Sequence, residues 1–254
     1  MADITSFYQG NVEDSGKVNW RGDQVSVPQG GQSIYETSSV QLAELGSRKV
    51  VGDRVFRYAK AGGAISAGEL AQYGGTQLIN VTAGDDNPAG GKLFTWYAAT
   101  AINANDFAEG YLISQSGTAA NLGFTYRVKS HGAISATSTG NLTLYDSLVK
   151  AVDTADKWTL QQNLYNGCSQ MAAGTALPLG VAPVAVTSGD YFWLQTFGPA
   201  AVKAGTNATA GLSLIAGNTG AVIPAGTTGK APVGVAMQTL TSGEKGMVFL
   251  TIAP

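Results

Sequence analysis

Short apolar runs separated by small and polar residues extend along most of the chain. Gln77–Val81 and Met247–Ile252 are two examples, with Gly, Asn, Ser or Pro close to each end. Val, Thr, Tyr and Phe populate such runs, as they do on the half-buried surface of a sheet. Helical periodicity is scarce, and only Ser38–Leu45 and Asp146–Val152 have the pattern for two helical turns each. The pattern predicts an all-β (mainly β) protein with few short helices.

A short turn motif recurs ahead of several of these runs. It consists of a small residue, a Gly and then usually an acid or Thr. Glycine supplies the positive φ that tight turns need, and the next residue re-enters the sheet. Spacings of roughly 15–20 residues between several copies favour small β-barrel or sandwich modules. The copies are Ala67-Gly68-Glu69, Ala83-Gly84-Asp85, Ser188-Gly189-Asp190, Ala204-Gly205-Thr206, Ala225-Gly226-Thr227 and Ser242-Gly243-Glu244.

Two of these turns belong to a longer internal repeat. Residues 178–189 align without gaps on residues 232–243, and the Pro, Gly, Val, Ala, Thr, Ser and Gly positions are identical. An apolar run follows each copy. We interpret the copies as two equivalent hairpins that bracket one small barrel. A duplication and convergent turn chemistry both account for the identities.

The first 50 residues differ from the rest. Ser6–Ser39 is polar and rich in Gly and Gln, with only a few spaced apolar residues. Alone it cannot bury enough area to offset the entropy lost on ordering. We expect residues 1–50 to form an extended N-terminal arm, of which residues 2–40 bind another surface. The candidate partner-binding residues are Ile4, Phe7, Tyr8, Val25, Val27, Ile34 and Tyr35.

Charge is sparse toward the C-terminus. Residues 178–254 contain three Lys and two acidic residues, fewer than the isolated surface of a soluble domain usually carries. We expect this segment to be a small barrel that packs against other protein. Residues 51–177 would form a separate β-rich domain.

Composition excludes several classes of protein. One Cys and one His cannot build a disulfide framework or a Cys/His zinc site. The chain has a net charge of −2, so it lacks the excess of Lys and Arg that is typical of nucleic-acid-binding proteins. No apolar run approaches the length of a membrane helix, and the first residues do not resemble a signal peptide. We therefore expect no cofactor, metal, nucleic acid or membrane partner, and synthesis in a reducing compartment.

Reaction machinery is hard to find. His131 is the sole candidate for histidine acid–base chemistry, and Cys168 is the sole candidate thiol nucleophile. Nothing local pairs them, so an incidental loop His and a small buried Cys are the simpler interpretations. Asp85-Asp86 offers oxygen ligands for Ca²⁺ without the EF-hand spacing, and turn formation explains it equally well. We expect no enzymatic activity.

A cluster of aromatic residues leaves two interpretations open. It comprises Tyr191, Phe192, Trp193 and Phe197. Such residues form sugar-binding platforms on some proteins, but they also fill barrel cores. The core interpretation is the simpler one here.

Several segments resemble the head decoration (capsid cement) proteins of tailed bacteriophages. They are Phe197–Val202, Ala231–Ala236 and Ser242–Leu250. The stretch Leu45–Ala59 also resembles an N-terminal segment found in phage structural proteins. The resemblance covers about half of the chain, and residues 61–177 exceed the minimal decoration module.

The resemblance implies a structural, non-enzymatic protein. It would be a homotrimer on the outer capsid surface of the virion, bound to the major capsid protein after synthesis in the cytoplasm of the host bacterium. An N-terminal arm that orders on the shell fits this role. Many copies acting together would stabilise a pressurised head.

Two other functions remain to be weighed. A receptor-binding or tail-fibre adhesin is also β-rich and poor in charge, and Trp193 would be its candidate sugar contact. A polysaccharide depolymerase would need converging carboxylates or His, which the sequence does not display.

Overall fold

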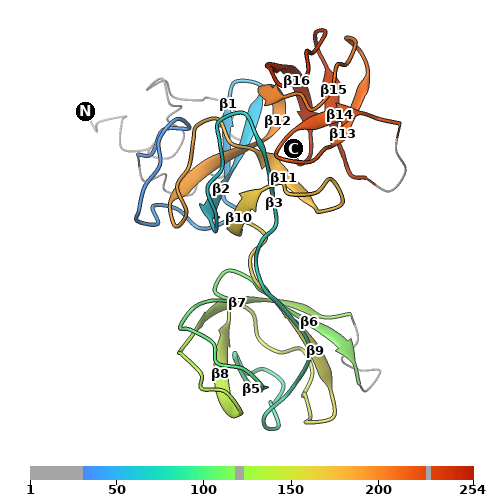
Figure 1. The fold of residues 1–254 in the computed structure, drawn as a ribbon. Coiled ribbons are helices and arrows are strands. Elements are labelled where there is room, and N and C mark those ends of the chain that lie inside the picture. The colour runs from blue at the N-terminus through green and yellow to red at the C-terminus, as the bar shows by residue number, and fades with distance from the viewer. Residues whose placement is uncertain (1–30, 118–122, 227–229) are drawn as a thin grey trace, which may run out of the picture. The chain divides into compact units, whose positions relative to one another are not determined.

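The computed structural model describes residues 31–117, 123–226 and 230–254. These residues form sixteen β-strands and no α-helix, which confirms the all-β class (Figure 1). The two expected helices are wrong. Within Ser38–Leu45, Ser38 pairs with Tyr191, and Asp146–Val152 ends in a bridge between Val152 and Asn87. Pairing with distant backbone replaces helical hydrogen bonds in both segments.

The chain divides into two compact units. Unit 2 is formed by residues 75–163, and unit 1 is formed by the described residues on either side of it. This division differs from the expected domains 51–177 and 178–254. Unit 2 is an insertion in unit 1 between strands β3 (Leu70–Gln72) and β10 (Asn166–Gln170).

The first half of unit 1 is a closed barrel of five strands. Their order is β2-β10-β3-β11-β12, and pairing of β12 with β2 closes the ring. The hairpin partner of β2 is β1 (Arg48–Val51), at the edge of the sheet. The bounds not yet given are β2 Arg54–Ala61, β11 Pro178–Val181 and β12 Tyr191–Lys203.

The second half of unit 1 is an open half-barrel that shares β12. This strand is 13 residues long, and its C-terminal part pairs with β16. The order continues β16-β15-β13-β14. The bounds are β13 Ser213–Ala216, β14 Val222–Pro224, β15 Pro232–Ala236 and β16 Lys245–Thr251.

The two halves of unit 1 repeat one topology. The order β10-β3-β11-β12-β2 in the barrel corresponds to β14-β13-β15-β16-β12 in the half-barrel. The parallel pairing of β10 with β2 corresponds to one parallel bridge between Ala204 and Val222. The sequence repeat therefore marks equivalent strands. Its copies lie in different halves, so the interpretation that they bracket one barrel is wrong.

A bridge followed by a turn recurs at the strand ends of both units. Each bridge joins two buried residues by a pair of backbone hydrogen bonds, and a turn follows each of them. Gly68, Gly189 and Gly243 have positive φ in these turns, as the motif predicts. Gly84 and Gly205 do not have positive φ, because they directly follow bridge residues. The bridged pairs are Ile65–Val186, Ala208–Leu240, Asn87–Val152 and Ile102–Ile134.

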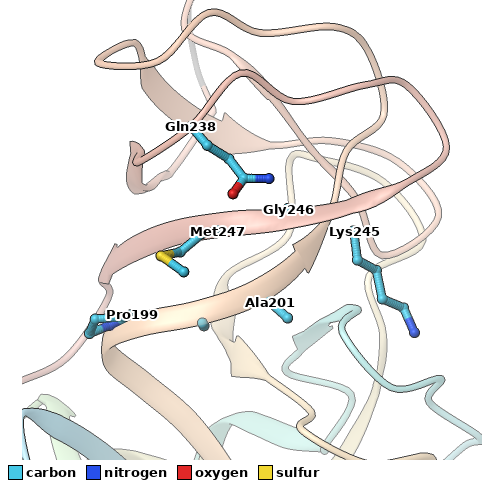
Figure 2. Close-up of a pocket in the computed structure, with 7 residues that line it drawn as sticks. Pro199, Ala201, Gln238, Lys245, Gly246 and Met247 are labelled. Carbon is cyan, nitrogen blue, oxygen red and sulfur yellow. The ribbon is translucent and has the colours of Figure 1, made fainter.

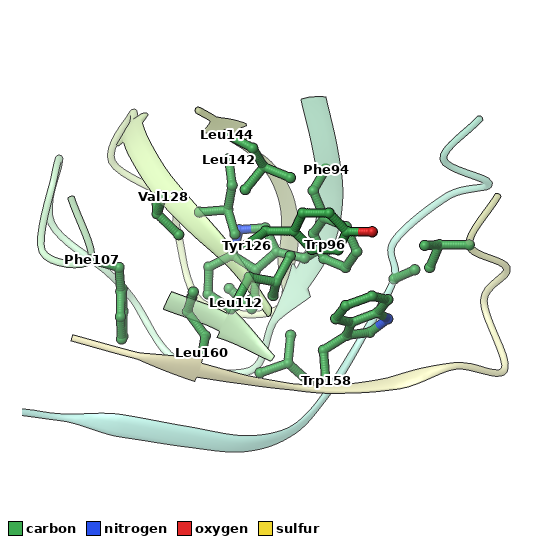
Figure 3. Packing of buried hydrophobic residues seen from close by; sticks show 14 of the residues in the cluster. Phe94, Trp96, Phe107, Leu112, Tyr126, Val128, Leu142, Leu144, Trp158 and Leu160 are labelled. Atoms are coloured by element: carbon green, nitrogen blue, oxygen red, sulfur yellow. The ribbon is translucent and has the colours of Figure 1, made fainter. Parts of the chain in front are cut away.

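Unit 2 is a six-stranded sheet curled around an aromatic core. The order is β4-β9-β6-β7-β8-β5, and a bridge between Ala83 and Trp96 joins its two ends. Phe94 and Trp158 meet edge to face in the interior, 5.3 Å apart (Figure 3). The bounds are β4 Gln77–Thr82, β5 Leu93–Ala98, β6 Tyr111–Ser116, β7 Thr125–His131, β8 Ser138–Leu144 and β9 Lys157–Gln161.

Candidate interaction surface

The outer face of the closed barrel is covered by the chain itself. Phe56 and Tyr58 of β2 and Trp193 of β12 are buried in one cluster with Ile34 and Leu45. The last two residues belong to the segment that precedes β2. Residues 31–51 are therefore an integral part of unit 1, and only residues 1–30 of the expected arm lie outside the described residues.

Hydrogen bonds fix the covering segment. Gln32 is central, because its carbonyl oxygen accepts from the Trp193 indole at 3.2 Å and its side-chain oxygen accepts from the Tyr58 hydroxyl at 2.9 Å. The buried Lys49 ammonium also donates to the Gln32 carbonyl, at 3.1 Å, and lies 5.3 Å from the centre of the Trp193 ring. Burying the Tyr58 hydroxyl raises its pKa, while its hydrogen bond with the Leu42 backbone opposes the rise.

The candidate partner-binding residues divide by position. Ile34 is 1% exposed and packs inside its own unit, so it is a core residue and not an anchor for a partner. Tyr35 is 58% exposed and stays a candidate contact, with its hydroxyl accepting from Arg54. The remaining candidates lie outside the described residues: Ile4, Phe7, Tyr8, Val25 and Val27.

The half-barrel has the same outer face with smaller side chains. Trp193 pairs with Tyr58 in the closed barrel, and Met247 pairs with Ala201 at the equivalent position of the half-barrel. Two positions further along the same face, Pro199 of the half-barrel stands where the closed barrel has Phe56.

A hollow of about 310 Å³ lies at this place (Figure 2). We call it the β12–β16 groove. Its lining residues are Pro199, Ala200, Ala201, Gln238, Lys245, Gly246 and Met247.

The groove lies within a wider apolar surface. Met247 is 47% exposed, and Met237 and Val235 beside it are 46% and 38% exposed. Phe249 and Phe197 extend the surface along the strands and meet edge to face at 5.3 Å. Clustered exposed apolar side chains of this kind mark interaction sites on soluble proteins. This surface is therefore the candidate functional site.

An ion pair holds the junction between the two halves. Lys203, at the end of β12, donates to Glu69 Oε1 at 2.8 Å and to the Thr219 carbonyl at 3.2 Å. Gln170 donates to the other oxygen of Glu69. Burial alone would raise the pKa of Glu69, but the hydrogen bond and charge of Lys203 outweigh it, so the pKa is lowered. Lys203 is thus engaged within unit 1, whereas Lys245 is exposed at the groove.

The two candidate catalytic residues do not meet. His131 belongs to unit 2 and Cys168 to unit 1. The His131 Nε2 accepts from the Phe107 backbone N–H at 3.0 Å, so Nδ1 carries the proton and donates to the Gly132 carbonyl at 2.8 Å. Burial raises the pKa of the Cys168 thiol to about 12, where it is a poor nucleophile at neutral pH. The surroundings of both side chains therefore indicate structural roles.

Two other candidate motifs also have structural roles. Asp85 Oδ1 accepts from the Asp86 N–H at 2.8 Å within a bend that precedes the bridge at Asn87. In the described parts of the chain, no three His, Cys, Asp or Glu side chains are grouped so that they could hold a metal ion.

Phe192 and Trp193 are at most 2% exposed, so they fill core positions and offer no open sugar platform.

The segments that resemble phage decoration proteins converge in space. They lie on β12, β15 and β16, which are hydrogen-bonded neighbours in the order β12-β16-β15. Their outward side chains form the groove and the apolar surface around it. The other resembling stretch, Leu45–Ala59, contains the β1–β2 hairpin.

The fold and this surface define an all-β protein of two barrel units, one of them internally duplicated. No family model and no curated protein matches the chain. Among solved structures, the chain is similar to the head fiber gp8.5 N base in bacteriophage phi29, at 16% identity over 63% of this chain and 94% of that one. The TM-score is 0.29, which does not establish a common fold. No helix among the described residues could span a membrane.

Proposed function

We propose that this chain is a structural protein of the phage head that decorates and cements the capsid. It binds the outer surface of the major capsid protein as a homotrimer and has no enzymatic activity. The convergence of the resembling segments on one sheet carries the proposal, because the β15–β16 pair and the C-terminal part of β12, more than 25 residues earlier in the chain, form one continuous surface.

The character of that surface supports an interaction role. Its side chains are apolar and include exposed Met247, Met237 and Val235, with the exposed Lys245 at the rim. Burying apolar area drives protein association, and sparse charge lowers the desolvation cost. A protein present in many copies needs only a modest free energy per contact to stabilise a shell.

The rigidity of unit 1 also suits a clamp. Paired backbone bridges tie its turns together, and the Glu69–Lys203 ion pair ties its two halves. A rigid binding surface loses little conformational entropy when it associates. The segment 1–30 retains the candidate capsid contacts that lie outside the described residues.

The proposal is tested by restoring the protein to phage heads that lack it. Purified protein is mixed with heads that lack it, and bound protein is measured by co-sedimentation while sedimentation velocity gives its oligomeric state. We expect a trimer that binds saturably, and Met247→Glu is expected to weaken binding at least tenfold. Tyr145→Glu, on unit 2, is the matched control. A monomer that fails to bind such heads would overturn the proposal.

A further inference from the structure

The duplication shows what normally lies on the outer face of a barrel half. In the closed barrel the face formed by β2 and β12 is covered by residues 31–51, an extended segment whose Ile34 and Leu45 side chains are buried against it. That segment directly precedes β2. In the half-barrel, the strand equivalent to β2 is the C-terminal part of β12, which continues from the closed barrel. No covering segment can therefore precede it in the chain.

The register makes the comparison exact at the level of residue pairs. Tyr191 and Lys60 pair in the closed barrel, and the equivalent pair in the half-barrel is Lys245 and Lys203. The next outward pair changes from two large aromatic side chains to Met247 and Ala201. The groove is thus the space that aromatic side chains fill on the equivalent face.

The size of the groove indicates its occupant. In the closed barrel the sheet supplies the aromatic rings, so the covering segment packs aliphatic side chains against them. In the half-barrel the sheet has small side chains at these positions, so a covering segment would have to supply the bulky side chains itself. A hollow of about 310 Å³ is large enough for such a side chain.

One segment outside the described residues has the right length and chemistry. Residues 1–30 contain the aromatic residues Phe7, Tyr8 and Trp20. Residues 1–16 contain three acidic residues and no Lys or Arg, which complements the exposed Lys245. The other undescribed stretches, 118–122 and 227–229, are five and three residues long.

The segment also starts within reach of the groove. Gln32 lies at the beginning of β12, where its side-chain amide donates to the Tyr191 carbonyl at 3.0 Å. Pro199 lies eight residues further along the same strand, roughly 27 Å at the usual rise per residue. A chain of 30 residues spans up to about 100 Å when extended.

We propose that residues 1–30 dock in the β12–β16 groove of their own chain, with an aromatic side chain filling the hollow. The half-barrel then acquires the same kind of cover that residues 31–51 provide for the closed barrel. Docking shelters the aromatic side chains of the segment in the protein free of capsid. The inference concerns the isolated protein, so it can fail while the capsid proposal stands, and the reverse also holds.

Oxidation of methionine tests the docking. Met247 lines the groove and Met237 does not, yet they are almost equally exposed in the described structure. Dilute full-length protein is treated with hydrogen peroxide, and peptide mass spectrometry follows both residues. We expect Met247 to react about tenfold more slowly than Met237, since a docked form about ten times as populated as the open form gives that protection.

Substitutions in the segment provide the decisive comparison. In full-length protein carrying Phe7→Ser, Tyr8→Ser and Trp20→Ser, the two methionines are expected to react at similar rates. Tyr35→Ser removes an exposed aromatic residue outside the segment, and this matched control is expected to keep the difference. Equal rates in the unsubstituted protein, or a difference that survives the triple substitution, would overturn the proposal. Protection that disappears on dilution would assign the occupant to a second copy and would also overturn it.

A second variant tests the groove from the other side. Ala201→Trp fills the hollow, so it is expected to displace the segment and to speed tryptic cleavage at Lys17 and Arg21 about tenfold relative to the unsubstituted protein. Near-ultraviolet circular dichroism checks that the variant is folded. Unchanged cleavage in a folded variant would contradict docking in the groove.

Discussion

Replacing Leu240 with Ala tests the architecture of unit 1. Leu240 is 2% exposed and forms one half of a bridged pair, with backbone hydrogen bonds of 2.7 and 3.1 Å to Ala208. Its side chain fills the space beside Gly246, where a Cβ would lie 2.3 Å from Leu240 Cδ2. Substitution removes most of a buried side chain and leaves a cavity. Such changes cost about 2–5 kcal/mol.

The expected thermal effect follows from that cost. For domains of roughly 100–150 residues, 1 kcal/mol shifts Tm by about 3–6 °C, so a loss of about 3 kcal/mol lowers Tm by about 10–15 °C. Differential scanning calorimetry is the assay. Since the chain has two compact units, we expect two transitions, of which only that of unit 1 moves.

Matched variants make the result interpretable. Phe107→Ala removes a core side chain of unit 2 and is expected to move only the other transition. Val149→Ala, at a position 60% exposed, is expected to move neither by more than about 2 °C. Equal shifts of both transitions in Leu240→Ala, or a shift below about 3 °C, would refute the division into units or the packing role of the bridge.

Three further outcomes are expected. Gly234→Ala places a Cβ 2.0 Å from the Phe249 carbonyl oxygen, so it is expected to lower the free energy of unfolding of unit 1 by at least about 2 kcal/mol in urea titrations. His131→Ala leaves the buried Phe107 N–H without its acceptor, and we expect unit 2 to lose about 1–3 kcal/mol by the same assay. Because the folded pKa of Glu69 lies below its ordinary value of 4.5, its contribution is complete above that pH and is lost as pH falls through the folded pKa. Unfolding free energies of Glu69→Gln are therefore expected to fall less than those of the unsubstituted protein on acidification.

Each of these three predictions has a control or a result that would contradict it. Gly132→Ala is the control for the glycine, because nothing lies within 4 Å of its Cβ position, and a similar loss there would remove the close-approach argument. His131→Gln is expected to recover part of the loss if its side-chain oxygen accepts from Phe107, and full stability of His131→Ala would contradict the structural role. Identical pH dependence with and without Glu69 would contradict the ion-pair argument.

Local patterns predicted local structure well. The alternation of apolar and small residues identified the all-β class, and the 54-residue repeat identified equivalent strands. Gly180 and Gly234 of that repeat are explained by one contact, since a Cβ at either would meet the carbonyl oxygen of the equivalent residue on the next strand, Gln195 or Phe249. Turn chemistry and close strand approach are short-range requirements, which leave their mark on few residues.

The same local patterns did not predict which strands pair over long distances in the sequence. The parallel pairing of β10 with β2 joins Asn166 to Lys60 across the whole of unit 2, so no local signal marks the insertion. The two expected helices failed for a related reason, because Ser38 pairs with Tyr191 and Val152 pairs with Asn87, residues that are distant in sequence.

The candidate surface was only partly predictable. The resembling segments identified its strands, but the groove depends on which side chains face outward together. Met247 and Ala201 leave a hollow because their side chains are smaller than those of Trp193 and Tyr58 at the equivalent positions. That comparison requires the strand register. Ile34 was misassigned because an apolar residue in a polar stretch has the same pattern whether it contacts its own core or a partner.

A difference map from electron cryomicroscopy tests the central claim most directly. Heads that lack this protein are imaged before and after addition of the purified chain. The account predicts added trimeric density on the outer surface of the head, with the β12-β16-β15 sheet of unit 1 in a protein–protein contact. Unchanged heads after saturation with folded protein, or density that contacts the shell through unit 2 alone, would contradict it.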